Sequence, residues 1–256
     1  MTDIVTVESL CKVYSAGRGQ TRRAVDNVSF TVAEGEVFGI VGESGSGKTT
    51  IARTLLRLAE PTSGFVSVAG IDPWAASREE RRHYRRTVQV VFQDPHSSMD
   101  PRMRIGPIVV EGLGESPRSA AMKTRIGSLL DMVGLPRSYA ALYPHELSGG
   151  QRQRVAIARA LALNPRVLVA DEPVSALDVS MRGQVLNLLV SLQRELDLTV
   201  LFISHDLGIV RQLCNRVAVM YQGRIVEMGD PVRIFHSPED DYTRALVASI
   251  PKVPVT

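Results

Sequence analysis

The strongest constraint on this chain is a glycine-rich turn that joins an apolar run to a helical pattern. Residues 37–41 read VFGIV, which is typical of a buried strand, and Ile51, Leu55 and Leu58 follow at helical spacing. The turn between them, GESGSGKT at residues 42–49, fits the phosphate-loop pattern G-x-x-x-x-G-K-[ST]. In such a loop, backbone N–H groups and a helix N-terminus surround phosphate oxygens, the lysine reaches the terminal phosphates, and the hydroxyl ligates Mg²⁺. The sequence therefore predicts a phosphate site here.

Further apolar runs and helical patterns alternate along the chain. Residues 167–170 and 200–203 are continuous apolar segments, as expected of buried strands. The helical stripe between them consists of Val185, Leu188, Leu189, Leu192 and Leu196. This alternation predicts an α/β fold with a mainly parallel sheet covered on both faces. Short strand patterns at residues 4–10, 28–32 and 64–69 predict a small antiparallel sheet beside that core.

One long segment breaks the alternation. Residues from about 95 to 145 are rich in Pro, Gly, Met and Ser, and only part of the segment has helical spacing. The apolar residues at that spacing are Ile126, Leu129, Leu130 and Val133. We expect a single domain over residues 1–256, with a mostly helical insert at about 95–145 and a C-terminal tail at about 230–256.

Polar residues follow the predicted core strands. Asp171 and Glu172 come directly after residues 167–170, where Asp171 would act on Mg²⁺ and Glu172 would take a proton from the attacking water. A general base of this kind contributes about 10²- to 10⁴-fold in rate. His205 follows the next strand and would contact the transferred phosphoryl group, although a single histidine is more often structural. Gln93 follows another apolar run, and its amide oxygen is a further candidate ligand of Mg²⁺.

A second glycine-rich segment also precedes a helical pattern. Residues 147–151 read LSGGQ, and Val155, Ala158 and Leu161 follow at helical spacing. Ser148 and the two glycines predict a helix N-terminus suited to binding an anion. Because the first loop already serves one nucleotide, this helix end is predicted to serve a nucleotide bound to another subunit.

The composition limits the class of partner. A net charge of +3, a pI near 9.0 and the lack of a basic block beside aromatic residues argue against a nucleic-acid partner. No run of about 18 apolar residues occurs and the start resembles no leader, which predicts a cytoplasmic chain. Cys11 and Cys214 lack the paired spacing of a metal or redox site and are expected to be inert thiols.

Taken together, the motifs resemble the ABC ATPase family over almost the whole chain. The resemblance implies a P-loop NTPase core with a mainly parallel sheet, an N-terminal antiparallel β subdomain and an inserted helical subdomain. In the family's order, the matching segments are the Walker A loop at residues 42–49, the glutamine loop at Gln93, the signature at residues 147–151, the Walker B acids Asp171 and Glu172, the D-loop at residues 175–178 and the switch His205. Tyr14 matches the aromatic residue that stacks on adenine, with Val25 beside the ring.

The resemblance also implies ATP and Mg²⁺ as cofactors, and a head-to-tail dimer of ATPase subunits. The ATP contacts would be Tyr14, Gly42, Glu43, Ser44, Gly45, Ser46, Gly47, Lys48, Thr49, Thr50 and Gln93. The catalytic residues would be Glu172 and His205, and the Mg²⁺ ligands Thr49, Gln93 and Asp171. The residues that meet the nucleotide of the second subunit would be Ser148, Gly149, Gly150, Gln151 and Asp178.

A narrower resemblance, to the peptide/nickel importer ATPases, rests on residues 91–102, 172–180, 242–246 and 250–251. It implies a related second ATPase, two transmembrane permeases, an extracytoplasmic solute-binding protein, and a peripheral position on the cytoplasmic face of the inner membrane. Peptide is the predicted solute. Nickel or glutathione uptake, and a soluble ABC ATPase without a transport role, remain alternatives. No cysteine follows Cys214, so we expect no iron–sulfur cluster.

Overall fold

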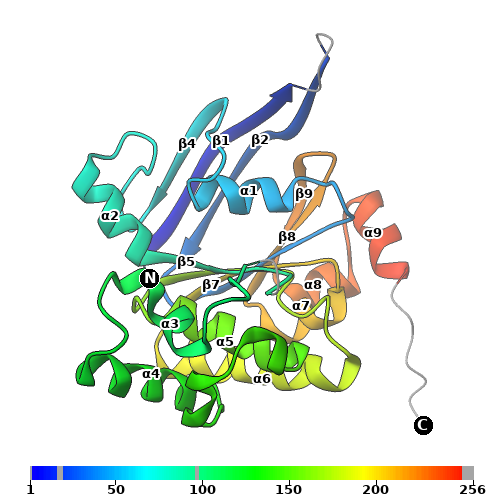
Figure 1. The fold of residues 1–256 in the computed structure, drawn as a ribbon. Helices are drawn as coiled ribbons and strands as arrows, with labels where there is room; N and C mark the ends of the chain where they lie inside the picture. Colours follow the sequence, from blue (N-terminus) through cyan, green and yellow to red (C-terminus); the bar gives the residue numbers. More distant parts are fainter. Residues whose placement is uncertain (1, 16–19, 96–97, 250–256) are drawn as a thin grey trace, which may run out of the picture. The chain divides into compact units, whose positions relative to one another are not determined.

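The computed structural model describes residues 2–15, 20–95 and 98–249 (Figure 1). Four residues of the motifs quoted above lie outside these ranges, namely His96, Ser97, Ile250 and Pro251. The chain forms two compact units, one made of Met1–Tyr84 with Thr199–Thr256 and the other of Arg85–Leu198.

The first unit opens with an antiparallel sheet in the order β2-β1-β4. Its strands are β1 (Asp3–Ser15), β2 (Thr21–Ala33) and β4 (Ser63–Val68). The predicted antiparallel sheet is confirmed, but β1 and β2 each extend over 13 residues, well beyond the short apolar patterns. Their pairing continues, with bulges, as far as Ser15 opposite Thr21. The reason is that backbone hydrogen bonds between strands do not require apolar side chains.

A second sheet in the same unit carries the strands in the order β7-β3-β8-β9. The bounds are β3 (Val37–Val41), β7 (Thr199–Ser204), β8 (Arg216–Tyr221) and β9 (Arg224–Gly229). The strand β3 pairs in parallel with β7 and β8, and β9 pairs antiparallel with β8. The Phe30 ring stacks on the Phe38 ring at 5.2 Å between centroids, which joins β2 to β3. The helices of this unit are α1 (Lys48–Leu55), α7 (Leu207–Leu213), α8 (Pro231–His236) and α9 (Asp241–Ala248).

The helix α1 ends earlier than its apolar spacing indicates. Leu55 is its last residue, and Leu58, which we expected on the buried face, is 64% exposed. Arg57 has a left-handed φ of 58°, and the Leu58 N–H donates to the Arg53 carbonyl at 2.7 Å. This is the geometry of a Schellman stop, so backbone conformation ends the helix before the apolar pattern does.

The second unit contains the parallel pair β5 (Val88–Val91) and β6 (Val167–Asp171). Its helical elements are α3 (Ile105–Val110), η1 (Glu111–Leu113), α4 (Ala120–Met132), η2 (Arg137–Ala141), η3 (Pro144–Glu146), α5 (Gly149–Leu161) and α6 (Val179–Glu195). The described elements between residues 98 and 146 are all helical, as expected of the insert. The predicted stripe of α6 is narrower than expected, because Leu188 is only half-buried and Leu196 caps the helix at 41% exposure.

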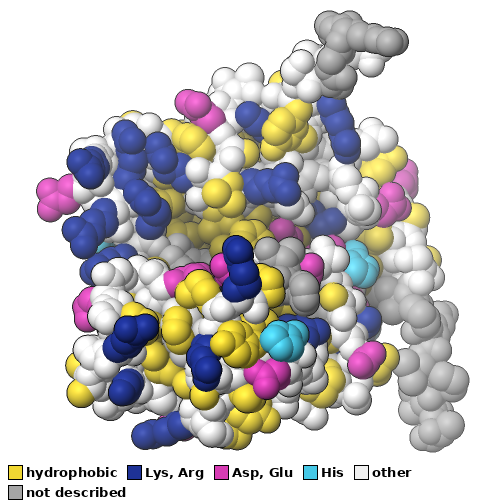
Figure 2. Space-filling model, in the orientation of Figure 1, with side chains coloured by type: hydrophobic (Ala, Val, Ile, Leu, Met, Phe, Trp, Pro, Cys, Tyr) yellow, Lys and Arg dark blue, Asp and Glu magenta, His cyan; other side chains and the backbone are white. Residues whose placement is uncertain are grey.

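The arginine-rich helix α2 (Arg78–Thr87) joins the two units in sequence. Lys and Arg side chains gather at the upper left of Figure 2, where α2 lies in Figure 1. Tyr84 anchors the helix, since it is buried and its hydroxyl donates to the Leu55 carbonyl. The arginines thus cover the solvated side of an anchored helix. Within the described ranges, no helix is both long enough and apolar enough to span a membrane.

Candidate nucleotide site

The loop after β3 is bent at glycines, in conformations that other residues rarely adopt. Gly42, Gly45 and Gly47 have φ angles of 147°, 82° and 114°. A Cβ atom on Gly42 would lie 2.2 Å from the Met220 carbonyl oxygen, and one on Gly47 would lie 2.4 Å from the Ala24 carbonyl oxygen. Surrounding backbone therefore excludes a side chain at Gly42 and at Gly47.

Lys48, the first residue of α1, keeps its ammonium group inside this loop. The residue is 5% exposed, and Nζ donates to the carbonyl oxygens of Gly42 at 2.7 Å and Glu43 at 2.8 Å. A compact cation at the N-terminus of a helix, beside the backbone N–H groups of a bent loop, provides positive charge for a phosphate.

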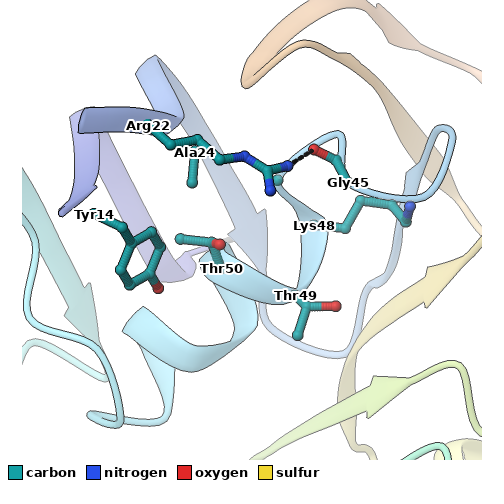
Figure 3. A pocket seen from close by; sticks show the side chains of 8 residues that line it. Tyr14, Arg22, Ala24, Gly45, Lys48, Thr49 and Thr50 are labelled. Atoms are coloured by element: carbon teal, nitrogen blue, oxygen red, sulfur yellow. Dashed lines mark hydrogen bonds between the residues drawn. The ribbon is translucent and has the colours of Figure 1, made fainter. Parts of the chain in front are cut away.

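A pocket opens beside the loop (Figure 3). Its lining residues come from β1, β2, the loop and α1, and they are Tyr14, Arg22, Ala24, Gly45, Gly47, Lys48, Thr49 and Thr50. The ammonium of Lys12 lies over the Tyr14 ring at 4.9 Å from the centroid. Val25, which we expected beside the adenine ring, is fully buried and does not line the pocket, whereas its strand neighbour Ala24 does. Successive side chains of β2 point to opposite faces of the sheet, so Ala24 faces the pocket and Val25 faces the core.

His205 leaves the sheet at the same edge as the phosphate loop. In the parallel pair of β3 and β7, Val41 lies opposite Ser204, so Gly42 and His205 each follow one member of that pair. Asp206 then caps α7, where its carboxylate accepts the N–H groups of two residues in the first turn at 3.0 and 3.2 Å. Strand register therefore places His205 and the phosphate loop at the same end of this strand pair.

The second unit gathers its polar residues in the same manner. In the parallel pair of β5 and β6, Val91 lies opposite Ala170. Gln93 follows β5, while Asp171 ends β6 and is 8% exposed. Both residues thus stand at the carboxyl end of this strand pair, and amide and carboxylate oxygens are ligands that Mg²⁺ accepts.

Glu172 has a strained backbone. Its φ is +50°, a left-handed value that costs a residue with a side chain about 1–3 kcal/mol. The Glu172 carbonyl accepts hydrogen bonds from both the N–H and the hydroxyl of Ser175, at 3.3 and 3.1 Å. These two bonds hold the turn that follows β6, and backbone strain of this kind is common at functional sites.

The LSGGQ segment forms a complete helix cap at the start of α5. The Ser148 hydroxyl accepts the Gln151 N–H at 3.3 Å, and the Gln151 side-chain oxygen accepts the Ser148 N–H at 2.9 Å. Gln153, one turn into α5, is fully buried and donates to the Phe92 carbonyl. The predicted helix N-terminus is confirmed, and α5 is tied to the segment that carries Gln93.

The family follows from comparison with known proteins. Residues 25–175 match the family described as ABC transporter. The chain belongs to this family. It is 51% identical over 253 residues to a protein of Brucella ovis named for peptide import and ATP binding, a match that covers 98% of this chain and 79% of that one.

Other relatives carry related names. An oligopeptide transport ATP-binding protein of Bacillus subtilis, YkfD, is 46% identical over 97% of this chain and 76% of its own. The glutathione import ATP-binding protein GsiA of Salmonella paratyphi A is 50% identical over 89% of this chain, a match that covers 37% of GsiA.

Solved structures of ABC cassettes have the same fold. The cassette MJ0796, solved as a dimer with ADP and Pi bound, has a TM-score of 0.78 and 31% identity over 89% of this chain and 98% of its own. The cassette cbiO1 of Clostridium perfringens, part of the ABC transporter complex cbiONQ, has a TM-score of 0.80 and 29% identity over 93% of both chains. The chain is thus an ABC ATPase, as its motifs predict.

The structure of this ABC ATPase sorts the predicted loop residues into two groups. Gly45, Gly47, Lys48, Thr49 and Thr50 line the pocket beside Tyr14. The loop residues that do not line it are Gly42, Glu43, Ser44 and Ser46. In the second group, two backbone groups bond to other parts of the chain and not to the pocket. The Ser46 carbonyl accepts from the Gly223 N–H, and the Glu43 N–H donates to the Tyr242 hydroxyl.

The D-loop lies at the start of α6 in the second unit. Asp178 occupies the N-cap position and is exposed, and within the described structure its side chain forms no capping hydrogen bond. Val179 is 82% exposed, which is unusual for a valine at the first helical position. Asp178 and Val179 thus form an exposed surface at the start of α6.

Arg22 is a pocket residue that our sequence analysis missed. Its guanidinium donates to the Gly45 carbonyl at 3.3 Å, and Figure 3 shows the side chain reaching toward the loop above Thr50. An isolated arginine in a strand gives no motif, and only the pairing of β1 with β2 places it by the loop.

Burial raises the pKa of the Cys214 thiol to about 12, which agrees with the predicted inert thiol.

Proposed function

We propose that this chain is the ATP-hydrolysing motor of an importer for peptides. The observation that carries the solute class is the 51% identity, over 98% of the chain, to a relative named for peptide import. Glutathione, itself a tripeptide, is the second candidate, because a relative named for its import is 50% identical over 233 residues. Both candidates require the same ATPase chemistry.

The residues of the first unit bind the nucleotide in this proposal. Tyr14 stacks on adenine, the N–H groups of residues 42–50 and the Lys48 ammonium hold the phosphates, and His205 contacts the transferred phosphoryl group. The support is the pocket lined by Tyr14 and Lys48 and the register that brings His205 beside the loop. Catalysis then consists of positioning and of charge placed where the transition state needs it.

Glu172 serves as the general base and accepts a proton from the attacking water. Its left-handed backbone at the end of β6 supports this role. The Thr49 hydroxyl, the Asp171 carboxylate and the Gln93 amide are hard oxygen donors, so they fit Mg²⁺. When bound, Mg²⁺ would neutralise charge on the phosphate oxygens.

The LSGGQ helix end serves the nucleotide of a second ATPase subunit, a related paralogue, whose own LSGGQ helix end contacts the nucleotide of this chain. Ser148, Gly149, Gly150 and Gln151 present the start of α5, and Asp178 begins α6. The support is that the Ser148 cap uses only a hydroxyl lone pair, so the hydroxyl proton stays available to a phosphate oxygen. The dimer of the cassette MJ0796 is a relevant precedent.

The remaining partners follow from the importer class. They are two transmembrane permeases and an extracytoplasmic solute-binding protein, which places this chain at the cytoplasmic face of the inner membrane. The cassette cbiO1 belongs to a transporter complex of this general kind. No nucleic-acid partner is proposed.

Purification of tagged Glu172→Gln protein from native membranes, with ATP and Mg²⁺, tests the proposal. We expect ATP binding to persist, hydrolysis to fall by about 10²- to 10⁴-fold, and two polytopic membrane proteins and a second ATPase to co-purify. Recovery of soluble partners alone would remove the transport role. Uptake of labelled oligopeptide, glutathione or Ni²⁺ by the reconstituted complex then separates the solutes.

A further inference from the structure

The C-terminal helix α9 reaches the phosphate loop through one hydroxyl group. The N–H of Glu43 donates to the Tyr242 hydroxyl oxygen at 3.1 Å, across 199 positions of sequence. Both residues belong to the first compact unit. None of the motifs that assign ATP chemistry to this chain includes Tyr242, so this contact calls for its own explanation.

The contact holds one peptide of the loop at both ends. In the Gly42–Glu43 peptide, the carbonyl oxygen accepts from Lys48 Nζ at 2.7 Å, and the N–H donates to Tyr242. The C=O and N–H of a trans peptide point in opposite directions, so the two bonds together fix the orientation of its plane. Gly42 has φ of 147° and lacks a Cβ, which would otherwise leave this peptide free to rotate.

A second loop peptide is held from the same part of the chain. The Ser46 carbonyl accepts from the N–H of Gly223 at 2.9 Å, in the turn between β8 and β9. The Gly223 carbonyl in turn accepts from the Asp26 N–H at 2.8 Å. Because the Ser46 carbonyl faces the turn, the N–H of Gly47 in the same peptide faces the opposite side. Gly47 lines the nucleotide pocket.

Tyr242 itself has little freedom to leave the loop. Its ring stacks on the Tyr221 ring at 4.1 Å between centroids, with 25° between the planes. The next residue, Thr243, is fully buried. Burial also raises the pKa of Tyr242, so its hydroxyl stays neutral at physiological pH.

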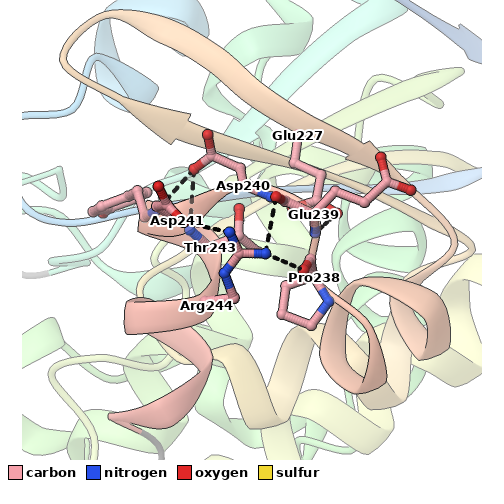
Figure 4. A network of polar contacts seen from close by, with 8 residues as sticks. Glu227, Pro238, Glu239, Asp240, Asp241, Thr243 and Arg244 are labelled. Carbon is pink, nitrogen blue, oxygen red and sulfur yellow. Dashed lines mark hydrogen bonds and ion pairs between the residues drawn. The ribbon is translucent and has the colours of Figure 1, made fainter.

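The start of α9 is anchored by a buried carboxylate (Figure 4). Glu227 of β9 is 7% exposed and accepts the N–H groups of Glu239 at 3.1 Å and Asp240 at 3.2 Å. Asp240 then caps the helix by accepting the N–H of Tyr242 at 2.9 Å and that of Thr243 at 3.2 Å. The backbone that carries Tyr242 is therefore fixed to the same sheet from which the phosphate loop departs.

We propose that Tyr242 is a positioning residue of the ATP site, which acts on Lys48 through the Gly42–Glu43 peptide. The inference rests on the proposed binding of ATP phosphates by this loop. Loss of the Tyr242 hydroxyl would free the Glu43 N–H, let the peptide turn and move the carbonyl that holds the lysine ammonium. Because a single hydrogen bond is at stake, we expect a loss of about three- to tenfold in ATP affinity.

The test compares Tyr242→Phe with Tyr221→Phe in the full-length chain. Both variants keep the stacked rings, but the Tyr221 hydroxyl accepts from the Gln222 side chain and not from the loop. We expect Tyr242→Phe to raise the Kd and KM for ATP about three- to tenfold with an unchanged melting temperature, while Tyr221→Phe matches the unaltered protein. Equal ATP affinity of the two variants would overturn the proposal.

A double-mutant cycle with Lys48→Ala separates positioning from general loosening of the fold. If Tyr242 acts through Lys48, Tyr242→Phe will weaken ATP binding in the Lys48 chain and have little further effect in the Lys48→Ala chain. The same fold-loss in both backgrounds would overturn the proposal. If the unaltered chain itself bound no ATP, the proposed function would fail first, and the inference with it.

Discussion

The two glycine-rich helix starts of this protein are supported in opposite ways. The cap of α5 is local, since Ser148 and Gln151 bond each other across three positions. The start of α1 follows Gly47, which has a left-handed φ and, within the described structure, provides no capping side chain. Its loop is held by distant groups, including the Gly223 N–H and the Tyr242 hydroxyl. Similar glycine content therefore hides a difference: one helix start is built by its own sequence, and the other by the surrounding fold.

The largest expected effect comes from adding one carbon to the loop. Gly42→Ala would place a Cβ 2.2 Å from the Met220 carbonyl, at a φ of 147°. We expect a loss of about 3 kcal/mol or more in unfolding free energy, together with loss of ATP binding. Urea denaturation and nucleotide titration measure both quantities.

Two control glycines sharpen this test. Gly70→Ala has a φ of 77° but no atom within 4 Å of the new Cβ, so it isolates backbone strain from the steric clash. Gly150→Ala meets only the flexible end of Met181 and is expected to cost about 1 kcal/mol or less. A Gly42→Ala protein as stable as Gly150→Ala would remove the contrast between the two helix starts.

Ser148→Arg tests whether the α5 start serves a nucleotide on another subunit. We expect the variant chain to bind ATP normally, because its own loop is unchanged, while hydrolysis at the site completed on its partner falls by about 10²-fold. Mixed dimers with one variant subunit, assayed for single-turnover hydrolysis, report the two sites separately. Loss of the variant's own ATP binding would show that the arrangement in trans is wrong.

Arg22→Ala tests a smaller contribution at the mouth of the pocket. The guanidinium stands 3.3 Å from the Gly45 carbonyl, and its charge lies beside the residues proposed to bind phosphate. Because the side chain is exposed, we expect ATP affinity to fall by only about three- to tenfold, with a weaker effect at high salt. Arg23→Ala is the matched control, since that neighbour pairs with Asp26 and does not line the pocket. Equal effects of both variants would exclude a specific role for Arg22.

The smallest expected effect is one on stability. Ser148→Ala removes the hydroxyl that accepts the Gln151 N–H, and it should cost about 1 kcal/mol in unfolding free energy. Ser148→Gly should lower the free energy of unfolding by only a few tenths of a kcal/mol, because glycine is well tolerated at the N-cap position. Equal losses for the two variants would mean that the hydroxyl does not stabilise the helix.

The residues that sequence located correctly are those whose signal is local. The Ser148 cap and the strand before Asp171 could be predicted, because capping spacing and apolar runs act over a few residues. Leu58 was misplaced because Arg57 adopts a left-handed conformation that no spacing indicates. The extension of β1 and β2 was missed because strand pairing continued through polar residues.

By itself, the sequence determined the class of fold, the phosphate loop, the acids at the end of β6 and the family. These depend on short patterns whose physical cause is contained within each segment. Only the tertiary structure decided that Arg22 lines the pocket and that Tyr242 binds the loop, 199 positions from Glu43. Such contacts arise from strand order and register, which bring together residues that carry no shared pattern along the chain.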